Sequence, residues 1–312
     1  MIQFKVVGGE EILRSVSFQD VVESIEKYLK LRAEGKVLIP PRITFTPPKG
    51  WWGIMPCYVK GGRYAIVKIV SSFPENYKLN LPCIQGLILV LDNEDGRVKY
   101  AIDAITTTAL RTASASLIAA KYSVWWKPRK ILLIGCGVQG SYHAKAFLEY
   151  FQDSELYLYD IEPSKALKLS RELGTARVKV ALKLQDVRKN APYDIVLACT
   201  TSKTPVVYDW MLGSRAFICS IGAHKPEERE VSDKVVEKAE LIIVDTLEGC
   251  KSETGDIIQP LKAGILEGKK IIELHQLLNY HVKEKIIFYK SVGTALFDYA
   301  ATIKILEKLG LE

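Results

Sequence analysis

Short apolar segments alternate with stretches of helical periodicity from residue 130 onward, which is the pattern of a parallel sheet with helices on both faces. Six segments have the length and composition of buried strands: Ile131–Ile134, Glu155–Asp160, Val178–Ala181, Asp194–Thr200, Ala216–Ile221 and Leu241–Asp245. The second part of the chain is therefore predicted to be a doubly wound α/β domain of the Rossmann type.

The first part of the chain has a different pattern. Residues 17–34 carry an apolar stripe at helical spacing, and residues 106–122 form a predicted helix rich in Ala and Ser. Between them lie β-rich runs separated by turn residues, with a hairpin signal at Asn93–Gly96. The predicted strands are Ile43–Thr46, Gly53–Val59, Arg63–Val70, Gly86–Leu91 and Arg97–Asp103. This pattern indicates an α+β domain with a largely antiparallel sheet.

The end of the chain is predicted to return to the first domain. Lys285–Lys290 has the composition of a strand that follows the last strand of the Rossmann series, and Thr294–Leu309 that of a helix. A connector with two Trp residues and Pro128 separates the two patterns. We therefore predict a substrate and dimerisation domain at 1–123 with 291–312, and an NAD-binding domain at 124–290.

Composition narrows the class of protein. The 312 residues are 48% hydrophobic and 25% charged, and the net charge of +7 is spread along the chain, so we expect no nucleic-acid partner. No apolar run is long enough for a membrane span, and the N-terminus has no signal-peptide pattern. The six cysteines and four histidines are scattered. We expect a cytoplasmic protein with free thiols and without a metal site.

A glycine-rich motif follows the first strand of the α/β domain. Gly135, Gly137 and Gly140 have the spacing GxGxxG, they open a predicted helix, and Asp160 ends the next strand. In such a motif the first glycine permits a tight turn, the second lets the backbone approach a pyrophosphate, and the third lets helix and strand pack closely. The context predicts a dinucleotide site, with a glycine turn in another α/β protein as the alternative.

Asp160 bears on the choice of cofactor. A carboxylate at this place accepts hydrogen bonds from both ribose hydroxyls and repels a 2′-phosphate. The residues after it, up to Lys165, include no Arg that would bind that phosphate. NAD is therefore favoured, and NADP stays possible.

Lys68 and Arg111 occur in sequence surroundings that are unusual for a positively charged residue. Lys68 interrupts an apolar strand, either as an amine within a site or as an edge-strand lysine facing solvent. Arg111 lies among small residues near the start of a helix, where a bound carboxylate would balance it; a structural ion pair is the alternative. Arg42 by itself has no distinguishing feature.

The ordered motifs resemble those of the ornithine cyclodeaminase/mu-crystallin family. The matching pieces are Pro41-Arg42, Ile54-Met55-Pro56, Val67-Lys68, Pro74-Glu75-Asn76, Thr108-Ala-Leu-Arg111-Thr112-Ala113, Ile134-Gly-Cys-Gly-Val-Gln139, Arg229-Glu230, Thr254-Gly255-Asp256 and Lys290-Ser-Val-Gly293. They span almost the whole chain in order, which is more specific than the glycine motif.

The resemblance implies a homodimer and assigns roles to residues. Arg42, Lys68 and Arg111 would bind the substrate's α-carboxylate or its nitrogen, and Met55 joins this set. The cofactor set comprises Gly135, Gly137, Val138, Gln139, Gly140, Asp160, Thr200, Ser291, Val292 and Gly293.

The sequence departs from the family's cyclodeaminases at two places. His224 occupies the position of their acidic residue after the strand at Ala216–Ile221, and Trp52-Gly53 stands where a glutamate would receive a distal amino group. A histidine is a competent proton donor near neutral pH, so Lys68 and His224 are the candidate catalytic residues; a loop histidine without chemistry is the alternative.

Three functions follow from these observations. The first is an NAD(P)-dependent reductase or dehydrogenase that transfers a hydride at the α-carbon of a small amino or imino acid, such as pyrroline-2-carboxylate or the pyruvate–ammonia–alanine couple. The second is an ornithine cyclodeaminase with catalytic NAD. The third is a binder of NAD(P)H or another ligand without enzymatic activity, like mu-crystallin.

Overall fold

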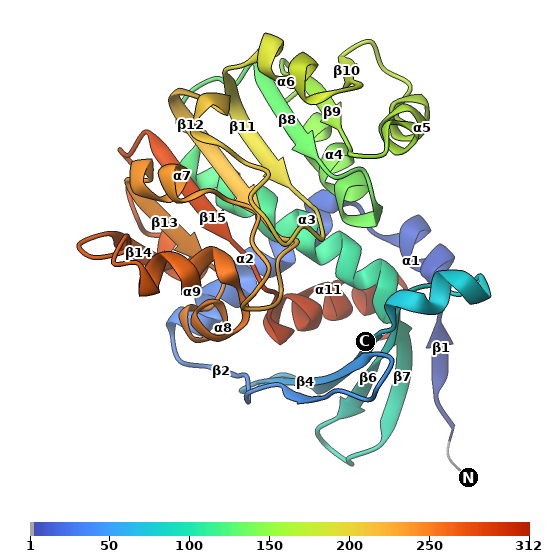
Figure 1. Cartoon of the computed structure of the whole chain (residues 1–312). Coiled ribbons are helices and arrows are strands. Elements are labelled where there is room, and N and C mark those ends of the chain that lie inside the picture. The colour runs from blue at the N-terminus through green and yellow to red at the C-terminus, as the bar shows by residue number, and fades with distance from the viewer. Residues whose placement is uncertain (1–2) are drawn as a thin grey trace. The chain divides into compact units, whose positions relative to one another are not determined.

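The chain folds into two compact units in a computed structural model that describes residues 3–312, apart from the side chain of Tyr77. One unit runs up to Ala115 and resumes at Gly293–Glu312, and the other is Ser116–Val292 (Figure 1). The division falls inside helix α3 (Ala104–Ser123), whose last residue is the boundary that the sequence indicated.

The described part of the first unit contains a seven-stranded sheet in the order β1-β7-β6-β5-β4-β2, with β3 paired to β4. Its strands are β1 (Lys5–Val7), β2 (Val37–Leu38), β3 (Ile43–Phe45), β4 (Trp51–Val59), β5 (Tyr64–Ser72), β6 (Ile84–Asp92) and β7 (Val98–Asp103). All pairs are antiparallel except β1 with β7. The five predicted strands are confirmed, whereas β1 and β2 are too short to produce a sequence pattern.

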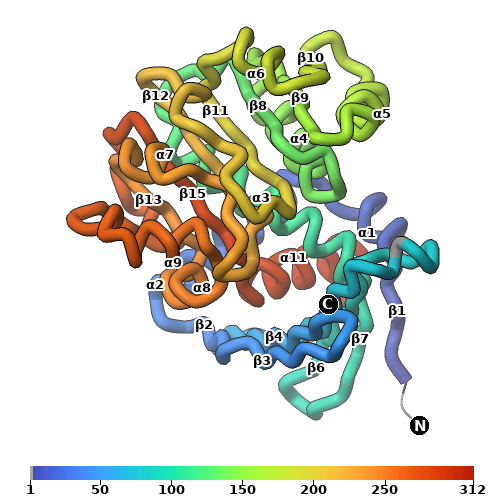
Figure 2. Tube along the Cα trace, in the orientation of Figure 1, coloured from blue at the N-terminus to red at the C-terminus, as the bar shows by residue number. Residues whose placement is uncertain are grey.

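Helices cover one face of this sheet. They are α1 (Gly9–Ser15), α2 (Phe18–Ala33) and the C-terminal α11 (Ala295–Lys308), with a 3-10 turn η1 (Pro74–Leu79) between β5 and β6. Helix α11 contacts α2, β4 and β5, so the end of the chain completes the core of the first unit (Figure 2). The Ser24 hydroxyl donates to the Ala300 carbonyl at 2.7 Å, and the Tyr28 and Tyr299 rings meet edge to face.

Alternation along the central strands decides which side chains enter this core. Met55, Cys57 and Ile66 point inward and are buried, and Lys68 follows Ile66 on the same face of β5. Strand β5 lies between β4 and β6, so the interpretation of Lys68 as an edge-strand lysine is wrong. A lysine ammonium is therefore carried into the interior of the unit by the register of its strand.

The described residues of the second unit form an eight-stranded, wholly parallel sheet in the order β10-β9-β8-β11-β12-β15-β13-β14. The strands are β8 (Lys130–Ile134), β9 (Glu155–Tyr159), β10 (Val178–Ala181), β11 (Tyr193–Ala198), β12 (Leu212–Ser220), β13 (Leu241–Val244), β14 (Lys270–Glu273) and β15 (Ile286–Lys290). The six predicted strands are confirmed, and the order reverses between β8 and β11, the switch point at which open α/β sheets bind ligands.

The strand predicted at Lys285–Lys290 is confirmed as β15, the last strand along the chain. In the sheet it lies between β12 and β13, a place that the sequence did not predict. All five of its residues are buried, as a strand inside a parallel sheet requires. The chain passes through β13 and β14 before it returns, so sequence order does not give the order in the sheet.

Helices separate these strands along the chain. They are α4 (Val138–Tyr150), α5 (Pro163–Leu173), α6 (Leu184–Asn190), α7 (Asp233–Lys238), α8 (Leu247–Glu253), α9 (Gly255–Lys262) and α10 (Leu274–Leu277), with a 3-10 turn η2 (Asp209–Met211). Figure 1 shows α4, α5 and α6 toward the β10 end of the sheet and α7, α8 and α9 toward the β14 end. Of the helices that the structure describes, none has both the length and the apolar character needed to cross a membrane.

Candidate functional site

The glycine motif forms the turn between β8 and α4. Gly135 has a φ of +94°, a conformation that disfavours residues with a Cβ. A Cβ at Gly140 would lie 1.9 Å from the Gly135 carbonyl oxygen, so helix and strand meet here without room for a side chain. Gly137 caps α4 without a side-chain hydrogen bond, and a Cβ there would meet nothing within 4 Å. The helix N-terminus is thus open to an anion such as a pyrophosphate.

Two polar groups beside this turn fit a dinucleotide. The side-chain oxygen of Gln139 is buried and has no hydrogen-bond partner among the described residues. The Asp160 carboxylate accepts backbone N–H bonds from Cys136 at 2.7 Å and from Glu162 at 2.8 Å, one on each oxygen. Each oxygen keeps a lone pair that a ribose hydroxyl can use. The residues present therefore fit NAD.

Three charged side chains meet inside the first unit. The Lys68 ammonium lies 2.5 Å from one oxygen of Asp298, and the Arg111 Nε donates to the other oxygen at 3.0 Å. Lys68 comes from β5, Arg111 from α3 and Asp298 from α11. The exposed fractions of the three residues are 2%, 6% and 0%. We call Lys68, Asp298 and Arg111 the cation cluster.

The cation cluster carries two positive charges and one negative charge. Burial lowers the pKa of Lys68 to about 8; the Asp298 carboxylate opposes this fall, and the Arg111 charge adds to it. Burial by itself would raise the pKa of Asp298, but the Arg111 and Lys68 charges lower it. The arrangement therefore holds Lys68 close to its protonation midpoint at mildly alkaline pH and favours an additional anion.

Arg42 and Gly293 lie beside the cation cluster. The Arg42 Nη2 donates to the Gly293 carbonyl at 2.8 Å. Gly293 has a φ of +83°, and a Cβ there would lie 2.9 Å from Nη2 of Arg111. Arg42 and Arg111 therefore both lie next to Gly293. Met55 pairs with Lys68 in the register of β4 with β5.

The expectation that Arg111 lies near the start of a helix needs correction. Helix α3 begins at Ala104, so Arg111 lies about two turns into the helix. The helix dipole acts within the first turn, so it does not disfavour a cation at this depth. The structural ion pair that was the alternative is present, with Asp298 as its partner, and Lys68 shares that carboxylate.

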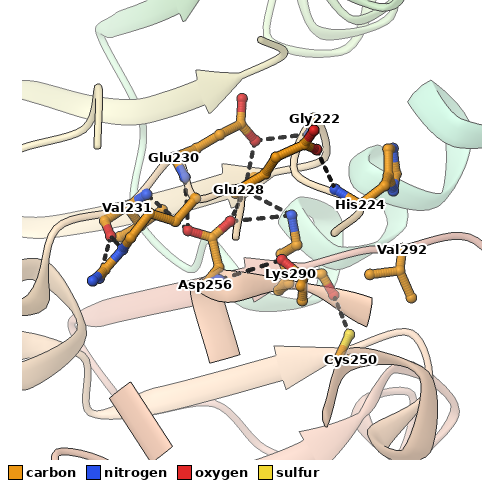
Figure 3. Close-up of polar contacts among 12 residues, drawn as sticks. Gly222, His224, Glu228, Glu230, Val231, Cys250, Asp256, Lys290 and Val292 are labelled. Carbon is orange, nitrogen blue, oxygen red and sulfur yellow. Dashed lines mark hydrogen bonds and ion pairs between the residues drawn. The ribbon is translucent and has the colours of Figure 1, made fainter. Parts of the chain in front are cut away.

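A second buried network lies at the carboxyl edge of the sheet in the second unit. The Lys290 ammonium lies 3.1 Å from Asp256 and donates to the Ser220 hydroxyl at 3.0 Å; the Ser220 oxygen lies 2.7 Å from both Asp256 and Glu230. Figure 3 shows Asp256 reaching Lys290 with Glu230 beside it. All four residues are 0% exposed. We call Ser220, Glu230, Asp256 and Lys290 the carboxylate network.

Three predicted cofactor residues of the second unit donate hydrogen bonds to buried carboxylates. The Glu230 carboxylate accepts from the backbone N–H and the hydroxyl of Thr200. The Asp245 carboxylate accepts from the Ser291 hydroxyl at 2.8 Å and the Val292 N–H at 3.0 Å. Thr200, Ser291 and Val292 therefore sit in turns that are fixed by hydrogen bonds.

His224 lies apart from the carboxylate network. It is an exposed residue in the loop after β12, and its backbone N–H donates to Glu228 at 3.3 Å (Figure 3). The catalytic role of His224 stays a prediction.

Asp298, Glu230 and Asp256 were not assigned a role from the sequence. Asp298 is the acidic residue within an apolar helical stretch, and Leu296, Phe297 and Tyr299 around it are buried. A charge on an apolar face is the signal that could have identified it. Glu230 and Asp256 belong to matched pieces of the family pattern, but nothing in their local sequence indicates that they share Ser220.

Comparisons with known proteins place this chain. The model of the ornithine cyclodeaminase/mu-crystallin family matches residues 5–310. Alanine dehydrogenase of Archaeoglobus fulgidus is 28% identical over 97% of this chain and 94% of its own length. The resemblance that the ordered motifs indicated is confirmed.

Solved structures agree with this placement. Thermococcus litoralis delta(1)-pyrroline-2-carboxylate reductase, in complex with NADH and L-proline, has a TM-score of 0.89 and 29% identity, with 98% of this chain and 97% of that chain covered. An archaeal alanine dehydrogenase dimer with bound NAD has a TM-score of 0.88 and 26% identity, with 98% and 95% covered. NAD(H) is bound in both of these related structures.

Proposed function

The chain belongs to the ornithine cyclodeaminase/mu-crystallin family, and we propose that it is an NAD-dependent oxidoreductase acting at the α-carbon of a small 2-imino or 2-amino acid. Pyrroline-2-carboxylate with its product proline, and pyruvate plus ammonia with alanine, are the two candidate couples. Three relatives with these activities are 28%, 24% and 29% identical to this chain. Residues 1–123 with 291–312 form the substrate domain in this proposal, and residues 124–290 bind the cofactor.

The cation cluster is the observation that supports a carboxylate-bearing substrate. Two buried cations share one buried carboxylate, so the cluster has an excess positive charge in a place where water cannot solvate it. A substrate carboxylate supplies the missing anion, and the planar guanidinium of Arg111 suits two parallel hydrogen bonds to it. Arg42, which lies at Gly293 beside Arg111, is the second carboxylate ligand.

Each residue then has a defined task in the reaction. NADH supplies the hydride. Arg111 and Arg42 hold the carboxylate and thereby fix the α-carbon next to it, so orientation accounts for much of the rate gain. Lys68 holds a proton for the substrate nitrogen; its pKa of about 8 makes proton transfer in either direction accessible near neutral pH. Asp298 orients Lys68 and Arg111 without needing to contact the substrate.

The cofactor assignment rests on the glycine motif and Asp160. Gly137 leaves the N-terminus of α4 open to the pyrophosphate. Asp160 favours the two ribose hydroxyls of NAD over the 2′-phosphate of NADP. In this proposal Thr200, Ser291 and Val292 contact the nicotinamide half.

A panel assay tests the function. Delta(1)-pyrroline-2-carboxylate, and pyruvate with ammonium, are each incubated with NADH or NADPH, and cofactor oxidation is followed. We expect oxidation of NADH with one of these substrates and a weaker reaction with NADPH. L-ornithine with NAD forms the second arm: proline and ammonia without net NADH would identify a cyclodeaminase instead. Binding of NADH without turnover of any substrate would contradict an enzymatic function.

We further propose that the chain forms a homodimer through the outward face of the first unit's sheet. On β4, β5 and β6 three successive cross-strand rows of this face are apolar: Ile54, Ile69 and Leu87; Pro56, Val67 and Leu89; Tyr58, Ala65 and Leu91. All of them are half-buried or exposed. A second copy is the proposed occupant because the similar archaeal alanine dehydrogenase is a dimer. Val67→Glu should yield a monomer in light scattering, and an unchanged mass for wild type and variant would refute this interface.

A further inference from the structure

The Glu230 carboxylate connects two turns at the carboxyl edge of the parallel sheet. One oxygen accepts from the Thr200 backbone N–H at 2.6 Å and the Thr200 hydroxyl at 2.8 Å. The other accepts from the Gly222 backbone N–H at 2.7 Å and lies 2.7 Å from the Ser220 hydroxyl. Thr200 follows β11 and Gly222 follows β12, so a single side chain sets the separation of the two turns.

Asp256 fixes the position of Glu230 in turn. One oxygen of Asp256 accepts from the backbone N–H groups of Glu230 at 2.8 Å and Val231 at 2.9 Å. The other oxygen of Asp256 pairs with Lys290 at the end of β15. Strand β15 is therefore tied to the same two turns through Asp256 and Glu230.

The two turns leave no space for adjustment. A Cβ at Gly222 would lie 1.8 Å from the Thr200 carbonyl oxygen and 2.7 Å from a Glu230 carboxylate oxygen. A displacement of either turn would therefore have to move the other, or break a hydrogen bond to Glu230. Glu230 thus adds a constraint beyond the pairing of β11 with β12, which ends at Ala198 and Ser220.

We infer that Glu230 is a positioning residue for the nicotinamide half of the cofactor. The glycine motif after β8 and Asp160 after β9 account for the pyrophosphate and the adenosine ribose. A dinucleotide bound across the switch point must extend its other half over the strands on the far side, which begin with β11 and β12. Glu230 fixes the turns of both strands. This inference rests on the proposed NAD-dependent function.

Glu230→Gln separates positioning from simple loss of structure. A glutamine offers one acceptor oxygen and one NH2 group, so either Thr200 or Gly222 loses the acceptor of its backbone N–H. The affinities of the variant for NADH and for ADP-ribose, which lacks the nicotinamide, are measured by calorimetry. We expect NADH to bind about 10-fold more weakly and ADP-ribose to bind as in the wild type.

Turnover provides a second readout. A shift of the reacting carbon by a fraction of an ångström should lower kcat by about 100-fold. The primary isotope effect with NADH deuterated at the transferred position should rise, because hydride transfer becomes rate-limiting. Asp194→Asn is the matched control: this carboxylate also accepts two backbone N–H bonds in the second unit, from Arg129 and Lys130 near the start of β8. We expect it to change neither affinity nor the isotope effect.

Ser220→Ala keeps the inference testable if Glu230→Gln does not fold. It removes the Ser220 hydroxyl that contacts Glu230 and keeps the bonds that the Thr200 and Gly222 backbone N–H groups donate to Glu230, so the same selective loss should appear at smaller size. Equal losses of NADH and ADP-ribose affinity, or no loss in either variant, would overturn the inference. The binding ratio requires no turnover. A wild-type protein inactive on every substrate would therefore refute the proposed reaction, while the ratio still decides the role of Glu230.

Discussion

Lys68 and Lys290 are both buried lysines, yet their surroundings shift the pKa of the ammonium group in opposite directions. Each lies on an interior strand of a sheet, with 2% and 0% of its surface exposed. Burial lowers the pKa of Lys68 to about 8, in spite of Asp298. Burial also acts to lower the pKa of Lys290, but the charges of Asp256 and Glu230 outweigh it and raise that pKa.

The difference lies in the local charge balance. In the cation cluster, two cations share one carboxylate. In the carboxylate network, two carboxylates surround one lysine, and four backbone N–H groups, those of Thr200, Gly222, Glu230 and Val231, supply the remaining donors. The carboxylate network has one excess negative charge, and the hydrogen bonds from these backbone N–H groups stabilise it within the fold. The cation cluster has one excess positive charge, which favours a ligand of opposite sign.

Replacing each of the two lysines by methionine should give the largest effect, a difference in the free energy of unfolding. Lys290→Met leaves two buried carboxylates without their cation, and we expect the free energy of unfolding to fall by about 3 to 5 kcal/mol. Lys68→Met leaves Asp298 paired with Arg111, and we expect the ligand-free protein to lose about 1 kcal/mol or less. Urea denaturation of both variants measures the difference.

Lys179→Met serves as the control for the lysine-to-methionine change. Lys179 is exposed on β10 in the second unit, and its replacement should alter the free energy of unfolding by about 0.5 kcal/mol or less. Equal losses of stability at Lys68 and Lys290 would contradict the distinction between the two networks.

Removing a cation from the cation cluster should affect substrate binding while sparing the cofactor. Arg111→Ala leaves Asp298 balanced by Lys68 but removes the planar donor of the carboxylate, so we expect KM for the imino acid to rise about 100-fold. Arg111→Lys keeps the positive charge but lacks the planar guanidinium, so its KM should lie between those of the wild type and Arg111→Ala. Steady-state kinetics give KM, and the Kd for NADH should match the wild type. An unchanged KM in Arg111→Ala would remove Arg111 from the site.

Features of the fold that have a local sequence signal were predicted, and those that depend on long-range contacts were not. Seven of the eight strands described in the parallel sheet, all but β14, were predicted, as were the antiparallel sheet and the family, because periodicity and motif order are local properties of the chain. The place of β15 between β12 and β13 was not, because the crossover through β13 and β14 leaves no local signal.

Pairing of charges over long sequence distances was equally hidden. Asp298 balances Lys68 and Arg111 across 230 and 187 positions, and Lys290 meets Ser220 across 70. Lys68 and Arg111 could be singled out because a cation in an apolar or small-residue setting is unusual by itself. Whether a carboxylate of the protein pairs with such a cation depends on residues that only the fold brings close to it. The sequence therefore could not decide between a structural ion pair and a bound substrate carboxylate at Arg111.

The smallest expected effect is a pH dependence that only the cation cluster should show. With protonated Lys68 as the donor, kcat/KM for imino acid reduction should be level below about pH 8 and fall about tenfold per unit above it. The Asp298 carboxylate raises the pKa of Lys68, so Asp298→Asn should lower that pKa and move the fall about one unit or more toward acid. The substrate nitrogen titrates identically with both enzymes, so the displacement between their profiles belongs to the protein. Profiles that coincide would show that Lys68 does not hold the transferred proton.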